Sequence, residues 1–433
     1  MQFKKAIQHT ILWKVLNTII TFLINILLVR LLGAEQSGIF YYAITLLGLL
    51  ILVQSYSLEA GIVYYCSKNN NVSGIAFFIV PWLLLQLLIS LLVLFYLIPV
   101  GINRTMAVLY TISNLAILYC NGLYTAQKKF PALNFILGIV NLLLLLVLCG
   151  MYFFDLSFFS LTSFTALQPA AFFYCCGFTL QAILLTAVFF YSNKKPVGAG
   201  LIDKKMLKNI FAFSGLAFAG NLLFFLVVRV DYYFVEKYCT GIALSNYIQV
   251  SKLGQLLVLL PSVVAAVVFP YAAGAQQEES YLGKTQFFCR VITGCFIFFT
   301  LFIAVTGYWL FPLLFGPGFT AMYPALLLYL PGFFALCIIT VLAAYLAGAG
   351  LIKINLAASA FALIVVIAGD IALIPYFGIN GAAVASSIAY FVCMVYLLWY
   401  AKTKMQDSVY DFFILQTADI KMIAEYVSRK KRK

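Results

Sequence analysis

Long apolar stretches recur along almost the whole chain, and they limit what it can fold into. Many run for about 20 residues, which is enough for an α-helix to cross the hydrocarbon core of a bilayer. Residues 142–149 are continuously apolar, unlike the alternating strands of a membrane β-barrel. Only 9% of the 433 residues are charged, too few to cover a soluble protein of this length. The sequence therefore predicts an all-α membrane protein.

The hydropathy pattern predicts about twelve transmembrane helices in two six-helix lobes, residues 1–192 and 209–401. A basic connection at 193–208 separates the lobes, and a basic tail follows at 402–433. Because six is even, both lobes start on the same side of the membrane, which suits two parallel repeats. The expected spans are 11–32, 39–66, 75–98, 105–125, 131–154, 170–192, 209–234, 243–273, 286–314, 322–348, 352–376 and 379–401.

The distribution of Lys and Arg predicts the orientation. Of the 27 basic residues, the connections on one side hold only Arg30, Arg104 and Lys237, and most of the others lie on the opposite side. An excess of Lys and Arg marks the cytoplasmic side, so both termini are expected in the cytoplasm. The net charge of +14 therefore indicates topology, and no nucleic-acid partner is expected. The ten cysteines lack metal-ligand spacing, so neither a metal nor a cofactor is expected.

Polar residues form stripes on several predicted helices, because positions three and four apart share a helix face. Lipid cannot satisfy their amides, so the stripes should face protein or water. Hydrogen bonding between helices is one explanation, and a shared hydrophilic cavity is the other. We expect Asn17, Asn25, Asn114 and Asn121 to converge on one cavity between the two halves, as a transporter needs. The stripes are Lys14, Asn17, Thr21 and Asn25; Tyr110, Asn114, Asn121 and Thr125; and Asn134, Gly138 and Asn141.

Charged side chains inside the spans are a stronger functional signal, since each costs about 2.5–3.5 kcal/mol at the bilayer centre. Lys252 lies ~14 Å into its span, near the midplane. Lys14 and Arg229 lie nearer span ends, where snorkelling to the interface is an alternative. Lys252 is expected either to bind substrate or to belong to a buried ion pair. The acidic candidates, for that ion pair or for coupling to H⁺ or Na⁺, are Glu59, Asp231 and Asp370.

Several motifs resemble those of Wzx-type polysaccharide flippases. Residues 229–233 (Arg-Val-Asp-Tyr-Tyr), then Tyr247 and Pro270, resemble the seventh and eighth spans of that family. Residues 373–383 match its LIP-x-x-GI-x-GAA pattern, and 30–38 fit its R-x-LG-x-x-x-x-G turn. The connection at 314–319 with 330–332 is also similar. Each motif is weak alone, but their order and spacing cover nearly the whole chain and are typical of the multidrug/oligosaccharidyl-lipid/polysaccharide exporter superfamily.

The resemblance implies a MATE-like bundle that moves an undecaprenyl-pyrophosphate-linked oligosaccharide across the bacterial inner membrane by alternating access, for surface polysaccharides such as O-antigen. It also implies a lipid-linked glycan as substrate, with a glycan polymerase and glycosyltransferases as partners. A pyrophosphate needs basic counter-charges, and Lys252, Arg229 and Lys14 are the candidates. Family members often carry Asn where Asp370 stands, which leaves open whether Asp370 couples transport to an ion.

Three other functions compete with the flippase. A drug or cation antiporter of the same superfamily would need an acidic central cavity. A glycan polymerase or ligase would need acid–base groups outside the membrane. The only histidine, His9, is expected in the cytoplasm, and the outer connection at 155–169 contains no Lys, Arg or His, so the chain is predicted not to be an enzyme. A purely structural anchor would not need polar stripes.

Overall fold

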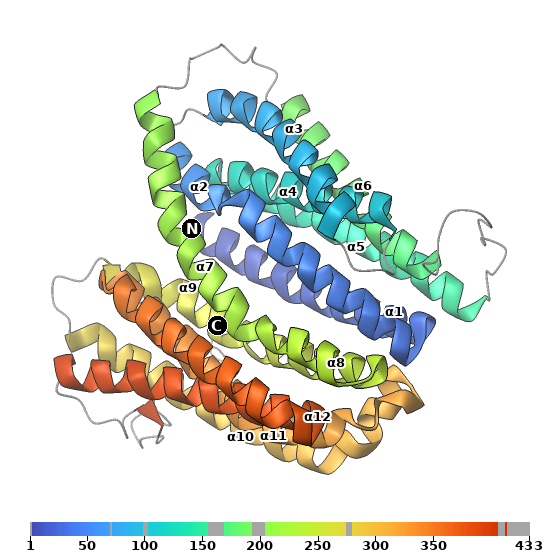
Figure 1. Cartoon of the computed structure of the whole chain (residues 1–433). Helices are drawn as coiled ribbons and strands as arrows, with labels where there is room; N and C mark the ends of the chain where they lie inside the picture. Colours follow the sequence, from blue (N-terminus) through green and yellow to red (C-terminus); the bar gives the residue numbers. More distant parts are fainter. Residues whose placement is uncertain are drawn as a thin grey trace, which may run out of the picture. The chain divides into compact units, whose positions relative to one another are not determined.

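The computed structural model describes residues 2–69, 72–97, 103–154, 169–192, 204–273, 279–405 and 412–413. In these ranges the chain is helical, apart from short turns (Figure 1). A 3₁₀ turn, η2 (Pro317–Phe319), precedes the eleventh α-helix. The α-helices are α1 (Gln2–Ser55), α2 (Leu58–Asn69), α3 (Val72–Leu97), α4 (Arg104–Ala126), α5 (Phe130–Phe153), α6 (Pro169–Ser192), α7 (Lys204–Tyr238), α8 (Gly241–Leu257), α9 (Leu259–Ala273), α10 (Glu279–Phe315), α11 (Met322–Gly348) and α12 (Ile352–Met405).

Within the described ranges, nine helices are long and apolar enough to cross a membrane, and there are ten such segments when the bent pair α8–α9 is counted as one. Both α1 and α12 contain a break, at Gly33 (φ 77°) and at Gly378 (φ 56°). Glycine adopts positive φ without the steric penalty that a side chain brings. Dividing α1 and α12 at these glycines gives the twelve spans that the hydropathy pattern predicts. The predicted all-α membrane fold is confirmed.

The expected second span, 39–66, is not one continuous helix. Helix α1 ends at Ser55 and α2 begins at Leu58, with Tyr56 (φ 50°) and Ser57 (φ 51°) in the left-handed region between them. Side chains satisfy part of the interrupted backbone, because the Ser55 hydroxyl accepts a hydrogen bond from the Ser57 backbone N–H (3.3 Å). Nothing in the apolar pattern of the sequence indicates this break, since both segments are hydrophobic.

The expected eighth span, 243–273, is bent by 41° between α8 and α9. Pro261, three residues after the break, explains where the bend lies. Its ring conflicts with the carbonyl four residues earlier, that of Leu257. The thiol of Cys337 on α11 donates to this carbonyl (3.8 Å) and so replaces part of the lost helix bond. A proline inside an apolar span is therefore a sequence signal for a bend of this kind.

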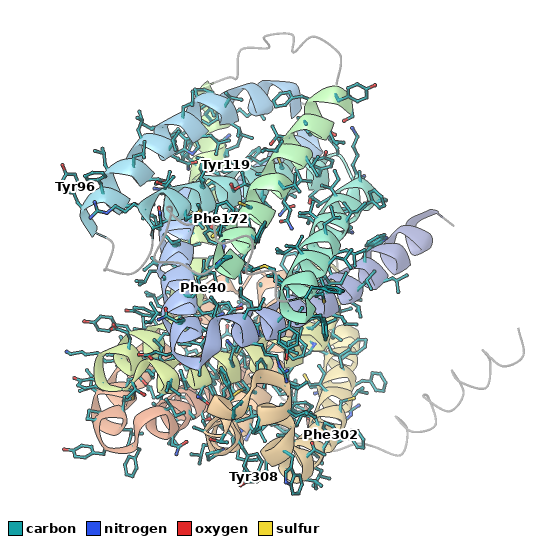
Figure 2. All side chains as sticks on the ribbon, turned by 90° about the vertical axis from the view of Figure 1, so that its right-hand side faces the viewer. Phe40, Tyr96, Tyr119, Phe172, Phe302 and Tyr308 are labelled. Carbon is teal, nitrogen blue, oxygen red and sulfur yellow. The ribbon has the colours of Figure 1, made fainter. Side chains whose placement is uncertain are left out.

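The contacts divide the chain into two compact units, residues 1–225 and 226–433, and the division falls inside α7. The predicted connection at 193–208 lies mostly outside the described residues, so the lobes 1–192 and 209–401 stay a prediction. We refer to the two units as the N-terminal and C-terminal units. Aromatic side chains such as Tyr96 and Tyr308 project outward, whereas Tyr119 is enclosed (Figure 2).

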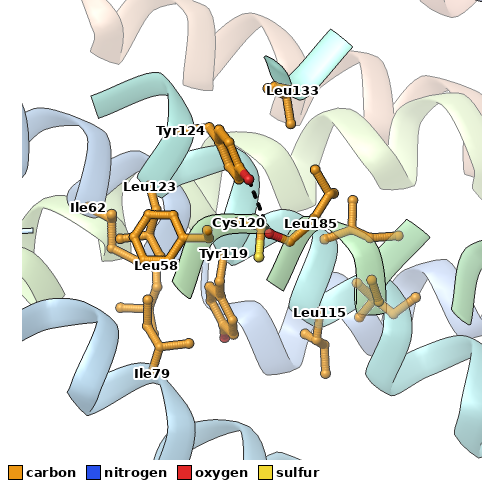
Figure 3. Close-up of a cluster of buried hydrophobic side chains, with 14 of the residues drawn as sticks. Leu58, Ile62, Ile79, Leu115, Tyr119, Cys120, Leu123, Tyr124, Leu133 and Leu185 are labelled. Carbon is orange, nitrogen blue, oxygen red and sulfur yellow. Dashed lines mark hydrogen bonds between the residues drawn. The ribbon is translucent and has the colours of Figure 1, made fainter. Parts of the chain in front are cut away.

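The N-terminal unit is built around α4, which packs against α2, α3 and α6. Its apolar core includes Leu58 of α2, Ile79 of α3 and Leu115 of α4 (Figure 3). The buried hydroxyl of Tyr124 donates to the backbone carbonyl of Leu185 on α6 (3.2 Å), which joins α4 to α6. These contacts hold four helices in register beside the break between α1 and α2.

In the C-terminal unit, α12 folds back on itself at Gly378. The two halves approach closely where small residues face each other: a Cβ on Gly369 would lie 2.8 Å from that of Ala385, and one on Gly381 would lie 2.5 Å from the carbonyl oxygen of Leu373. Small residues are what allow membrane helices to approach this closely. The hairpin brings the two halves of α12, with Asp370 on the first half and Ser386 on the second, into one site.

Candidate ion and substrate site

Asp231 of α7 is completely buried in the C-terminal unit. Its Oδ2 accepts hydrogen bonds from the Tyr247 hydroxyl of α8 (2.5 Å) and the Ser386 hydroxyl of α12 (3.1 Å). Its Oδ1 accepts from the backbone N–H of Tyr232 (2.9 Å). A buried carboxylate is stable only when its oxygens are paired. Three helices therefore converge on this one side chain.

A stack of aromatic rings holds Tyr247 in place. The ring of Tyr247 lies parallel to Tyr329 of α11 at 5.9 Å between centroids, and Tyr329 stacks on Phe333 at 4.1 Å. The hydroxyl of Tyr329 also shares a hydrogen bond with that of Tyr390 on α12 (3.2 Å). All four rings are at most 2% exposed. The packing fixes the ring of Tyr247 and so directs its hydroxyl at Asp231.

Asp370, on the first half of α12, is also completely buried, and neither of its carboxylate oxygens has a hydrogen-bond partner among the described residues. It lies close enough to Asp231 and Tyr247 to interact with both electrostatically. An ionised carboxylate in this position would cost several kcal/mol unless it gained a counter-charge. Asp231 and Asp370 together can therefore take up a proton or a small cation.

One basic side chain, Arg229, interacts electrostatically with Asp231, and a second, Lys252, interacts with Arg229. Arg229 of α7 donates from Nη1 to the Tyr232 hydroxyl and stands 4.9 Å from the centre of that ring. Lys252 of α8 is half-buried and close enough to Arg229 for their positive charges to repel each other. Two like charges in a poorly solvated region favour an anion that can contact both. The structure thus brings Arg229 and Lys252 together in one unit.

Polar stripes of the N-terminal unit face one another as well. The Asn141 amide of α5 donates to Oδ1 of Asn17 on α1 (3.2 Å), and the Gln181 amide of α6 donates to Oδ1 of Asn141 (2.7 Å). This ladder joins three helices, so Asn17 has the interhelical role that was one of the two explanations for the stripes. Lys14, one turn earlier on α1, is exposed.

The other predicted asparagines have different surroundings. Asn25 is buried at 8% exposure, and the Asn114 amide donates to the Tyr110 carbonyl of its own helix (2.8 Å). Oδ1 of Asn121 is buried and has no hydrogen-bond partner in the described part of the chain. Their convergence with Asn17 on one cavity between the two halves stays a prediction.

Sequence reasoning did not find the partners of Asp231 or the buried hydrogen bond between the amide of Gln86 and the backbone of Gln54. Tyr247 appears among the motif residues, but nothing in its spacing joins it to Asp231, and Ser386 is not singled out. The available signal for the amides was Gln86, a polar residue inside an otherwise apolar span. Across the described ranges, no group of three or more His, Cys, Asp or Glu residues gathers as a metal centre would require.

Solved structures of similar fold include multidrug transporters and a lipid flippase. No protein-family model and no curated protein sequence matches the chain. An inward-facing multidrug resistance MATE family transporter of the MOP superfamily aligns over 90% of this chain and 96% of its own (TM-score 0.66, 14% identity). The lipid II flippase MurJ, in an inward closed conformation, aligns over 92% and 89% (TM-score 0.63, 16% identity). A mutant of the Vibrio cholerae MATE transporter VcmN aligns over 94% and 98% (TM-score 0.61, 16% identity). The chain thus has the MATE-like fold that these drug transporters share with a lipid flippase.

Proposed function

We propose that this protein is a flippase that translocates an undecaprenyl-pyrophosphate-linked oligosaccharide across the bacterial inner membrane by alternating access. The observation that carries the proposal is that two basic side chains within predicted spans, Arg229 and Lys252, lie close enough for their charges to interact. A pyrophosphate has several oxygens that can accept charge-assisted hydrogen bonds from both. The MATE-like fold, which the lipid II flippase MurJ shares, supports the same substrate class.

In this proposal Lys252 and Arg229 hold the pyrophosphate, with Lys14 as a further basic contact. Asn17, Asn25, Asn114 and Asn121 provide amides for the sugar hydroxyls. The role of Lys14 and the asparagines rests on the sequence stripes. The surrounding bilayer takes the lipid tail, and glycosyltransferases and a glycan polymerase act before and after transport in making a surface polysaccharide such as O-antigen.

In this proposal the acidic pair, Asp231 and Asp370, binds the coupling ion. Asp231 and Asp370 are both fully buried, and the Asp370 oxygens lack partners among the described residues. Uptake of H⁺ or Na⁺ would neutralise the pair, and release would restore its charge. Because Asp231 bonds to α8 and α12, a change in its charge would alter contacts between three helices. Ion binding would in this way bias the C-terminal unit between two arrangements.

A drug or cation antiporter is the second candidate, and the acidic pair favours it. Buried carboxylates attract a cationic drug as well as a coupling ion, and two of the structures of similar fold are MATE transporters. The basic pair distinguishes the two functions, because Arg229 and Lys252 would repel a cationic drug. A flippase uses both pairs of charges, whereas an antiporter has no evident use for the basic one.

The proposal is tested with purified protein in proteoliposomes. A fluorescent undecaprenyl-pyrophosphate oligosaccharide reports flipping through a membrane-impermeant quencher, and a cationic dye reports antiport. We expect flipping of the lipid-linked sugar and no dye transport. Dye transport without flipping would establish the antiporter instead.

Lys252→Ala should lower flipping at least about tenfold, since it removes a charged hydrogen-bond partner worth about 1.5–3 kcal/mol. Lys252→Arg should keep part of the activity, because the charge survives with a different geometry. Lys237→Ala, at the exposed end of α7, is the matched control and should behave as the wild type. A structural ion pair at Lys252 would instead lower the amount of folded protein in the membrane, which is measured alongside. Wild-type flipping by Lys252→Ala would refute the substrate role.

A further inference from the structure

The chain returns to the C-terminal unit after its last helix has ended. Helix α12 ends at Met405, yet Phe412 is only 2% exposed. The ring of Phe413 lies 5.9 Å from that of Phe334 on α11, and Phe334 in turn lies 5.5 Å from Phe296 on α10. These distances are between ring centroids and are typical of packed aromatic pairs. The tail after α12 therefore docks on the bundle through two phenylalanines.

The docking position is far from the end of α12. Helix α11 ends at Gly348, and Phe334 lies 14 residues before that end, or about 21 Å at 1.5 Å per residue. Because α12 folds back at Gly378, its second half runs in the same direction as α11, and the two helices end on the same side of the unit. The eight residues from Met405 to Phe413 can span at most about 29 Å, so they can cover this distance. On the predicted topology this side is cytoplasmic, so the tail reaches the middle of α11 from the cytoplasm.

The tail docks beside the aromatic stack of the acidic site. Phe333, the next residue to Phe334, stacks on Tyr329 at 4.1 Å. Phe333 also packs tightly on α8, because a Cβ on Gly254 would lie 2.0 Å from its ring. Since the rings at 333 and 334 are adjacent on one helix, a displacement of α11 at the tail moves the stack as well. Docking of the tail is thus mechanically linked to the acidic site.

A buried thiol lies between the docking position and the cytoplasmic end of α11. Cys337 is one turn beyond Phe334, and positions three apart share a helix face. The thiol is 1% exposed and donates to the carbonyl of Leu257 at the bend between α8 and α9. A tail that comes from the cytoplasm and reaches Phe334 must pass the level of this thiol. Cys337 is therefore a natural reporter of whether the tail is docked.

We propose that Phe412 and Phe413 form a reversible plug, which closes the face of α11 around Phe334 and Cys337 to cytoplasmic water. Burial of the two rings favours the docked state, and ordering the chain that leads to them opposes it. The balance of two opposing contributions in so short a segment lets the plug leave and return while the helices stay folded. An undocked tail opens a path for water along α11 toward the acidic site. A permanently packed tail is the alternative.

The test follows single thiols in the purified full-length protein, so it needs no substrate and does not depend on the flippase proposal. A charged, water-soluble reagent labels the ten cysteines, and mass spectrometry gives the rate at each one. We expect Phe412→Ala/Phe413→Ala to speed the labelling of Cys337 at least about tenfold, because the docked state loses the apolar burial that favours it. The matched control is Phe298→Ala, which removes a 74% exposed ring two residues from Phe296 and should label at the wild-type rate.

Reversibility is tested by adding an excess of a synthetic peptide of residues 406–433 to the double variant. We expect this peptide to restore slow labelling of Cys337, and the same peptide with both substitutions to have no effect. Gel filtration and circular dichroism show whether each variant is folded. Phe413→Ala, which trims only the half-buried ring, must still speed the labelling and keeps the test decisive if the double variant does not fold. Wild-type labelling of Cys337 in the folded variants would overturn the plug, and a peptide that restores nothing would establish a permanently packed tail instead.

Discussion

Gly381→Ala tests whether the close approach of the two halves of α12 holds the acidic site together. A methyl group at Gly381 would lie 2.5 Å from the carbonyl oxygen of Leu373 and 2.7 Å from its carbonyl carbon, where ordinary contacts begin at 3.4 Å. The atoms it meets are backbone and cannot rotate away, so the halves must separate by roughly 1 Å. Overpacking of this kind costs about 1–3 kcal/mol. Alanine also gains up to about 1 kcal/mol over glycine inside a helix, so the clash is seen only against a control.

Gly283→Ala on α10 is that control, because a methyl group there meets nothing within 4 Å and so gains the helix propensity without a clash. The assay is thermal unfolding followed with a thiol-reactive dye. Buried thiols such as Cys289, Cys337 and Cys393 in this unit react only after unfolding. For a unit of this size, about 1–3 kcal/mol corresponds to a midpoint roughly 2–12 °C lower than that of Gly283→Ala. Equal midpoints would show that the halves do not pack as described.

The separation also predicts a functional effect. Asp370 lies on one half of α12 and Ser386 on the other, so moving the halves apart should displace Asp370 from Asp231 and weaken ion coupling. Ion-driven flipping should therefore fall in Gly381→Ala even at temperatures where the protein is fully folded, and it should be unchanged in Gly283→Ala.

Three further predictions follow from the structure and the topology. Tyr247→Phe removes a donor to the buried Asp231 carboxylate, which should cost about 1.5–3 kcal/mol and weaken ion-driven transport by roughly 10- to 100-fold, whereas Tyr233→Phe, an exposed neighbour, should have no effect. Gly33→Ala places a side chain at φ 77° and should lower the unfolding midpoint by straining the break in α1. Single cysteines at Asn193 or Ser408, which lie outside the described residues, should resist labelling from outside intact cells. Strong labelling at either position would contradict the cytoplasmic connection and tail.

The sequence predicted correctly those features that depend on a single helix, namely the spans, one break and one bend. The spans follow from runs of apolar residues, because each must match the thickness of the bilayer whatever it packs against. The break at Gly378 falls between two predicted spans, because the apolar run on each side has the length of one span. The bend before Pro261 follows from the backbone hydrogen bond that proline removes. The break at Tyr56 and Ser57 was missed, because neither residue type favours positive φ and the apolar pattern continues through it.

The runs of apolar residues are enough to show that this chain is a multi-span helical membrane protein and which of its charged residues lie inside spans. Which of those residues meet depends on how the helices pack. Helical periodicity gives the face that a side chain occupies but not the neighbour opposite, so the bonds from Tyr247 and Ser386 to Asp231 could not be read from spacing. The same holds for Gln54 and Gln86, whose hydrogen bond joins α1 to α3. Contacts between distant segments depend on the packing of the whole unit, and small residues such as Gly381 set how closely its helices approach.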